Sequence, residues 1–69
     1  MSDITLHVNG EPRTVAAPTT LAEVVATLSR AHSGVAAALN ETVVPRTDWP
    51  RTELSAGDRI EILTAVQGG

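Results

Sequence analysis

The sequence predicts an α+β fold, in which a mixed sheet of four to five strands has one helix packed across one face. Apolar and polar residues alternate in short segments near both ends of the chain, the period of a strand with one buried face. Between them lies one segment with helical spacing and residues typical of helix ends. With 69 residues, the chain has room for one domain, near the lower size at which a core folds without disulfides or metal.

The first element is a predicted hairpin. Residues 4–8 alternate between apolar and polar side chains, and Asn9-Gly10 follows directly. Asn-Gly favours a two-residue hairpin turn because both residues tolerate positive φ. We therefore expect residues 13–17 to return as an antiparallel strand that ends at Pro18.

A helix is predicted at residues 21–32. Thr20 and Glu23 have the spacing of a capping box, in which each satisfies a free amide at the helix start. Apolar residues then recur at i, i+3, i+4 and i+7. His32 suits the negative end of the helix dipole, and Gly34 offers the left-handed conformation that ends a helix.

The pattern of the remaining residues predicts two short strands followed by a longer last strand. In order, we expect a strand at 35–39, a turn at 40–42, an edge strand at 43–44, an irregular connection at 47–56 and a strand at 59–66. Ile60, Ile62 and Val66 are expected to face the core. This order is that of the β-grasp, or ubiquitin-like, fold, in which the last strand lies centrally beside the first. Residues 1–66 would form the domain and residues 67–69 a flexible tail leading into solvent.

One face of this sheet has no helix to cover it. If the odd-numbered residues of 35–39 point inward, the outward side chains form an apolar patch of Ala36, Ala38, Leu63 and Ala65, with Thr5 and His7 nearby. An exposed apolar patch usually marks a partner surface. We therefore predict that these residues dock partners, with Val66 as the last anchor before the tail. The alternative is scattered surface alanines in an alanine-rich chain.

Composition excludes several kinds of chemistry. The chain has no cysteine, so it can form neither a disulfide framework nor a thiolate metal site. It has no lysine, which a phosphate-binding loop requires. His7 and His32 lack the spacing of a zinc pair and are expected at the surface. The eight acidic residues are dispersed and fit a solvated surface better than paired general acids and bases. No metal, bound cofactor or catalytic residue is expected.

Net charge and hydropathy limit the classes of partner that the chain is expected to bind. A net charge of −3 argues against a nucleic-acid binder, which needs a basic face. No apolar run approaches the roughly 18 residues of a membrane span, and the first residues resemble no signal peptide. The expectations are a cytoplasmic location, no membrane partner and a monomer when free.

Three further features have structural interpretations. Trp49 is either a lid on the core or an anchor for a partner, and the lid is the favoured alternative. Arg46 and Arg51 are expected in surface ion pairs worth at most about 1 kcal/mol each. Asn40-Glu41-Thr42 matches a glycosylation sequon, but without a signal peptide we interpret it as a turn.

The terminal carboxylate of Gly69 is then the one candidate reactive group. It is an anion at neutral pH, hence a poor electrophile that must be activated before a nucleophile attacks it. Gly68 and Gly69 lack Cβ atoms, so with Gln67 they could thread a narrow channel in a second protein. Ordering that tail costs about 1 to 2 kcal/mol per residue, which contacts at the apolar patch would offset.

Two blocks of sequence resemble a known family. They are GVAAALNETVVPRTDW (residues 34–49) and LSAGDRIEILTAVQGG (residues 54–69), and VNGE and TLAEVVATL match an opening hairpin and helix. Together they resemble the ThiS family, the sulfur-carrier proteins of thiamine biosynthesis, over essentially the full chain. The alanine run at 36–38 departs from the bulkier mixture expected there.

The resemblance implies a non-catalytic carrier with defined partners. An E1-like adenylyltransferase would use ATP to adenylate Gly69, sulfur from a persulfide donor would give a thiocarboxylate there, and thiazole synthase would take that sulfur. Three alternatives remain open: the small subunit of molybdopterin synthase, which delivers sulfur to a pterin precursor; a ubiquitin-like protein modifier; and a plain interaction domain with an incidental tail.

Overall fold

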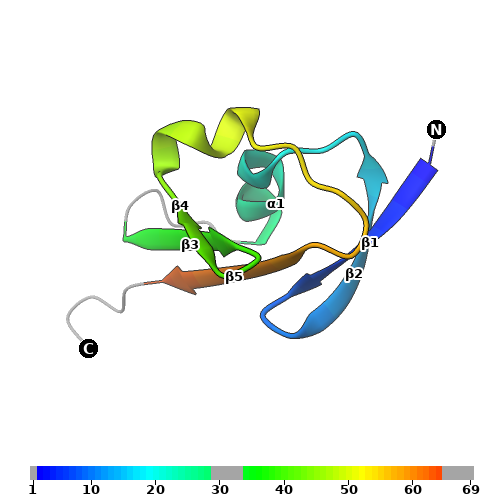
Figure 1. Cartoon of the computed structure of the whole chain (residues 1–69), viewed down its shortest axis with the longest axis horizontal. Coiled ribbons are helices and arrows are strands. Elements are labelled where there is room, and N and C mark those ends of the chain that lie inside the picture. The colour runs from blue at the N-terminus through cyan, green and yellow to red at the C-terminus, as the bar shows by residue number, and fades with distance from the viewer. Residues whose placement is uncertain (1, 29–33, 65–69) are drawn as a thin grey trace.

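The computed structural model describes residues 2–28 and 34–64, and these form one five-stranded sheet with helix α1 across one face (Figure 1). The strand order is β2-β1-β5-β3-β4, so the last strand lies centrally beside the first, as predicted. β5 runs parallel to β1 and antiparallel to β3. The elements are β1 (Ser2–Val8), β2 (Glu11–Ala17), α1 (Leu21–Leu28), β3 (Val35–Leu39), β4 (Thr42–Val44), η1 (Arg46–Arg51) and β5 (Arg59–Thr64).

The β1–β2 hairpin turns at the predicted dipeptide. Asn9 and Gly10 have φ values of 51° and 85°, the positive pair that a two-residue hairpin turn requires. Val8 pairs with Glu11 across the turn. β2 therefore begins at Glu11, two residues earlier than the sequence predicts, because the tight turn leaves no unpaired residue before it.

Asn9 also holds the central strand through its side chain. Direct pairing of β1 with β5 covers only His7 with Arg59 and Val8 with Ile60. Beyond it, the Asn9 N–H donates to the Ile60 carbonyl at 2.8 Å. The Asn9 amide then accepts from the Ile62 N–H at 2.9 Å and donates to the Ile62 carbonyl at 3.3 Å. The amide thus continues the hydrogen-bond ladder where the β1 backbone turns away.

Asn40, which directly follows β3, contacts β5 from the side opposite β1. The predicted turn is present, with φ of 50° at Asn40 and 73° at Glu41. The Asn40 N–H donates to the Arg59 carbonyl at 2.7 Å, and its Oδ1 accepts from the Arg59 N–H at 2.9 Å. Its Nδ2 donates to the Asp58 carboxylate at 3.2 Å. The sequon asparagine therefore has a structural role at the start of β5.

The helix begins as predicted, with one change in its cap. The Thr20 hydroxyl accepts from the Glu23 N–H at 3.3 Å, which is the first half of a capping box. The Glu23 carboxylate accepts from the Thr19 hydroxyl at 3.1 Å. Gly34 has φ of 73°, the left-handed conformation predicted for it. The predicted helix end at His32 lies outside the described residues.

The connection predicted as irregular over residues 47–56 is instead partly helical. Arg46–Arg51 form the 3₁₀ helix η1. Packing of Trp49 explains the difference, because its side chain is 6% exposed and its Nε1 donates to the Val44 carbonyl at 2.9 Å. A buried, hydrogen-bonded indole fixes the backbone around it. Trp49 is thus a lid on the core, the favoured alternative.

The core lies between α1, η1 and one face of the sheet. Its largest fully buried side chains are Leu6, Leu21 and Ile60. Ile62 is buried as predicted, and Val66 lies outside the described residues. The buried apolar residues are Leu6, Val8, Leu21, Val24, Val25, Ala37, Trp49, Leu54, Ile60 and Ile62.

Replacing Asn9 by glycine tests the contribution of its side chain to the central strand. Asn9→Gly keeps the positive-φ turn but removes both hydrogen bonds to Ile62. We expect the free energy of unfolding to fall by about 1 to 3 kcal/mol, because each lost bond leaves a partly buried backbone group unpaired. Urea denaturation measures this change.

Glu41→Gly is the matched control. It places glycine at another non-glycine turn position with positive φ, and the side chain it removes makes only an exposed ion pair. We expect this variant to be neutral or more stable. Equal unfolding free energies for Asn9→Gly and the unmodified chain would contradict a structural role for the Asn9 amide.

Candidate docking face

The face of the sheet opposite α1 carries the most exposed large apolar side chains of the described chain. Val43 on β4 is 73% exposed and Leu63 on β5 is 70% exposed. Buried Ile60 and Ile62 alternate with exposed Glu61 and Leu63 along β5. β5 therefore contributes side chains both to the core and to the open face.

Within the described residues, the predicted inward and outward faces of β3 and β5 are confirmed. Ala37 is buried in the core, whereas Ala36 is exposed and Ala38 is half-buried. Ala36 pairs with Leu63 and Ala38 pairs with Glu61, so these outward side chains are neighbours. Of the residues predicted to dock partners, Ala36, Ala38 and Leu63 thus share the open face, and their docking role stays a prediction.

The open face contains a shallow hollow of about 280 Å³. Ala36 and Ala38 line it from β3, Val43 from β4 and Leu63 from β5. Glu41 and Glu61 also line it. Sequence reasoning missed Val43, Glu41 and Glu61. The signal for Val43 was present, because one of two successive strand residues must face outward.

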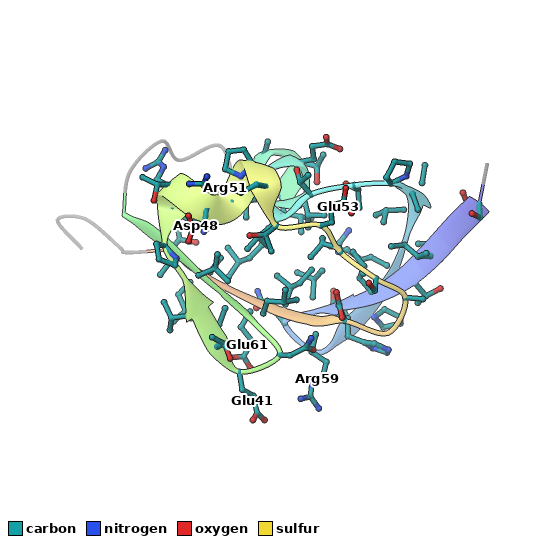
Figure 2. All side chains as sticks on the ribbon, turned by 45° about the horizontal axis from the view of Figure 1, so that its top comes forward. Glu41, Asp48, Arg51, Glu53, Arg59 and Glu61 are labelled. Atoms are coloured by element: carbon teal, nitrogen blue, oxygen red, sulfur yellow. The ribbon has the colours of Figure 1, made fainter. Side chains whose placement is uncertain are left out.

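Charged residues lie along one side of this hollow. Figure 2 shows Glu41 and Arg59 projecting from the sheet away from η1, with Glu61 near them. The Glu41 carboxylate lies 3.8 Å from the Arg59 guanidinium, and both side chains are largely exposed. Such a pair contributes little to stability. The Glu41 carboxylate is therefore available for contact with a partner.

The other residues singled out from the sequence lie apart from the hollow. His7 is exposed on β1, as predicted, and Arg51 forms its predicted ion pair with Asp48 at 3.2 Å. The ion pair predicted for Arg46 is not found among the described residues, and its guanidinium lies 5.7 Å from the centroid of the Trp49 ring instead. The guanidinium thus lies over the face of the indole ring, at a distance typical of a cation–π contact.

Several predicted residues fall outside the described part of the chain. They are His32 and the tail and its approach, Ala65, Val66, Gln67, Gly68 and Gly69. The description of β5 ends at Thr64, which pairs with Val35. The proposed boundary between a domain at 1–66 and a tail at 67–69 therefore stays a prediction.

Residues 2–28 and 34–64 contain neither a candidate metal centre nor a candidate membrane-spanning helix. No three or more histidine, cysteine, aspartate or glutamate side chains within these ranges gather where they could bind a metal ion. In the same ranges, no helix has the length and apolar character needed to span a membrane.

Strand order, helix and open face define a β-grasp domain of the ubiquitin-like class. The model of the ThiS family matches residues 6–69. The chain belongs to the ThiS family of sulfur carriers.

Individual relatives agree with this assignment. The sulfur carrier protein ThiS of Escherichia coli (strain K12) is 31% identical over 61 residues, which cover 88% of this chain and 92% of that protein. An uncharacterized protein, ycf40 of Pyropia yezoensis, is 34% identical over 68 residues, covering 99% of this chain and 96% of the relative.

Solved structures give the same fold. The crystal structure of the thiamine biosynthesis protein ThiS from Geobacter metallireducens superposes with a TM-score of 0.78 at 33% identity, covering 96% of this chain and 100% of that one. A solution NMR structure of a thiamine biosynthesis protein from the same organism gives a TM-score of 0.80 at 33% identity, covering 96% and 88%.

A charge placed on the open face should leave the fold intact. Leu63→Glu puts the new carboxylate in solvent, so we expect unfolding free energy to change by less than about 1 kcal/mol. The docking role predicted for Leu63 further requires that this variant bind a partner more weakly, because a charge replaces the apolar surface. Urea denaturation and a direct binding assay measure the two effects.

The neighbouring residue supplies the control. Ile62→Glu makes the same kind of change on the buried face, where Ile62 is 9% exposed, and we expect it to abolish stable folding. If Leu63→Glu also unfolded the chain, the assignment of Leu63 to a free surface would be wrong.

Proposed function

We propose that this protein carries sulfur on its C-terminal carboxylate for synthesis of the thiazole ring of thiamine. The observation that carries the proposal is that the match to the ThiS family runs through Gly69, the end of the chain. It is supported by the relatives named as sulfur carrier or thiamine biosynthesis proteins. The protein acts as a co-substrate of other enzymes and is not itself a catalyst.

Activation of Gly69 comes first. A carboxylate resists nucleophilic attack because it is already an anion. An E1-like adenylyltransferase joins this carboxylate to AMP from ATP and releases pyrophosphate. The resulting mixed anhydride has a good leaving group. ATP is bound by the activating enzyme, and no cofactor is assigned to the carrier.

Sulfur loading and transfer follow. A persulfide sulfur attacks the acyl carbon and displaces AMP, which leaves an acyl disulfide. A second thiol then attacks the donor sulfur of that bond, so that a new disulfide forms between the two thiols and the thiocarboxylate is released at Gly69. Thiazole synthase then takes this sulfur. Gln67 and Gly68 thread the enzyme channels, while Ala36, Ala38, Leu63, Ala65 and Val66 are assigned to docking.

The chain's composition is compatible with this use of the terminus. It contains neither cysteine nor lysine, so its side chains hold no thiol or primary amine to capture an activated acyl group. The rival role in pterin sulfuration uses the same tail chemistry. The relatives named for thiamine biosynthesis favour the thiazole pathway.

Removing the last residue tests the carrier role. Deletion of Gly69 should abolish sulfur loading while changing unfolding free energy by less than about 0.5 kcal/mol, since within residues 2–28 and 34–64 the last buried core residue is Ile62. The measurement is intact mass after incubation with ATP, the activating enzyme and a sulfur source.

Glu53→Gln is the control, since it changes an exposed side chain that precedes β5 and leaves the tail intact. We expect it to gain the mass of one oxygen replaced by one sulfur, as the unmodified chain should. Normal loading of the chain that lacks Gly69 would overturn the proposal.

A further inference from the structure

Asn9 directly precedes a glycine, and this pair allows a reaction of the asparagine side chain. A main-chain nitrogen can attack the side-chain amide carbon of an asparagine that precedes it and displace ammonia. A glycine at the attacking position lacks the Cβ that would crowd this approach. The chain contains two asparagines, of which Asn9 precedes Gly10 and Asn40 precedes Glu41. Asn9 is therefore the asparagine whose neighbour leaves it open to attack.

The β1–β2 turn is also open to water, which the reaction consumes. Asn9 and Gly10 are both exposed. A Cβ added to Gly10 would meet no atom of the described residues beyond its chain neighbours within 4 Å. Water can therefore reach the pair, and ammonia can leave it.

The fold itself restrains the Asn9 side chain. Its amide oxygen accepts from the Ile62 N–H at 2.9 Å, and its amide nitrogen donates to the Ile62 carbonyl at 3.3 Å. Attack requires the amide carbon to turn toward the Gly10 nitrogen, and the two hydrogen bonds hold the amide against β5 instead. The reaction therefore needs a local opening of the contact between Asn9 and Ile62, which a folded protein samples only part of the time.

We propose that Asn9 is a deamidation site whose reactivity is controlled by its contact with Ile62. When the contact opens, the Gly10 nitrogen forms a bond to the Asn9 side-chain carbon and passes its proton through water to the amide nitrogen, which departs as ammonia. Water then adds to either carbonyl of the resulting five-membered imide ring. The ring opens to aspartate or isoaspartate, so the two steps together exchange ammonia for water without oxidation or reduction.

Neither product restores both hydrogen bonds to Ile62. An ionised carboxylate only accepts, so one of its oxygens would face the Ile62 carbonyl where the Asn9 amide nitrogen donated. Isoaspartate also adds one carbon to the main chain of a two-residue turn, whose length sets the pairing of Val8 with Glu11. Deamidation is thus a one-way loss of the contact that joins the hairpin to β5. This inference does not depend on the proposed function.

Rates of ammonia loss in the folded and the denatured chain test the proposal. Both samples are held at the same neutral pH and temperature, with and without guanidinium chloride. Intact mass follows the exchange of NH for O, and peptide mapping assigns it to Asn9, Asn40 or Gln67. We expect Asn9 in the folded chain to react at least about tenfold more slowly than in the denatured chain. Equal rates at Asn9 in the two samples would overturn the protective role of Ile62.

Glu41→Gly is the matched variant for the role of the glycine, because it places a glycine after the other asparagine. In the denatured unmodified chain, Asn40 should react at least about tenfold more slowly than Asn9, since Glu41 has the Cβ that Gly10 lacks. In the denatured variant, Asn40 should react as fast as Asn9. If the substitution left the rate at Asn40 unchanged, the assignment of the reactive site to the pair Asn9-Gly10 would be wrong.

Asn9→Asp tests the consequence of the reaction, because it supplies one product directly. We expect this variant to unfold at a lower urea concentration than the unmodified chain. The difference should persist at high salt, since it comes from the carboxylate against the Ile62 carbonyl and not from the added net charge, which salt screens. An unchanged urea midpoint would contradict the claim that deamidation weakens the attachment of β5.

Discussion

Two asparagine side chains hold the central strand, and the arrangement of the whole sheet depends on them. β5 is the last strand in sequence, and neither of its neighbours is joined to it by a hairpin. Its pairing with β1 covers two residues on each strand. Asn9 extends that pairing to Ile62, and Asn40 hydrogen-bonds both backbone groups of Arg59. Each asparagine occupies the first position of a tight turn, so turn geometry and strand pairing are coupled.

This coupling fixes which residues face partners. Side chains alternate along a strand, so a slip of β5 by one residue would exchange its two faces. Leu63 would then enter the core and Ile62 would face solvent. By holding Ile62 and Arg59 in register, the two asparagines keep Leu63 beside Ala36 and Glu61 beside Ala38.

Local patterns predict much of this structure, and contacts between distant residues account for what they miss. The Asn9-Gly10 turn, the start of α1 and the faces of β3 and β5 follow from periodicity and turn chemistry. The Asn9 amide contacts a residue 53 positions away, which no local pattern reveals. The helical form of η1 likewise follows from burial of Trp49, a tertiary effect. The sequence analysis found part of the hollow on the open face, namely Ala36, Ala38 and Leu63. It missed Val43, which enters through β3–β4 pairing, Glu41, which lies in the turn between those strands, and Glu61, which enters through β3–β5 pairing. The chemistry assigned to Gly69 rests on elimination and family membership, since the tail lies outside the described residues.

Transfer of the sulfur tests the central claim most directly. The carrier should first be loaded with isotopically labelled sulfur and purified, then mixed with thiazole synthase and its other substrates, with intact mass and product isotope content followed together. We expect the carrier to return to its unmodified mass as the label appears in the thiazole. Retention of the sulfur with thiazole synthase, but its loss to the large subunit of molybdopterin synthase, would contradict the assignment to thiamine synthesis.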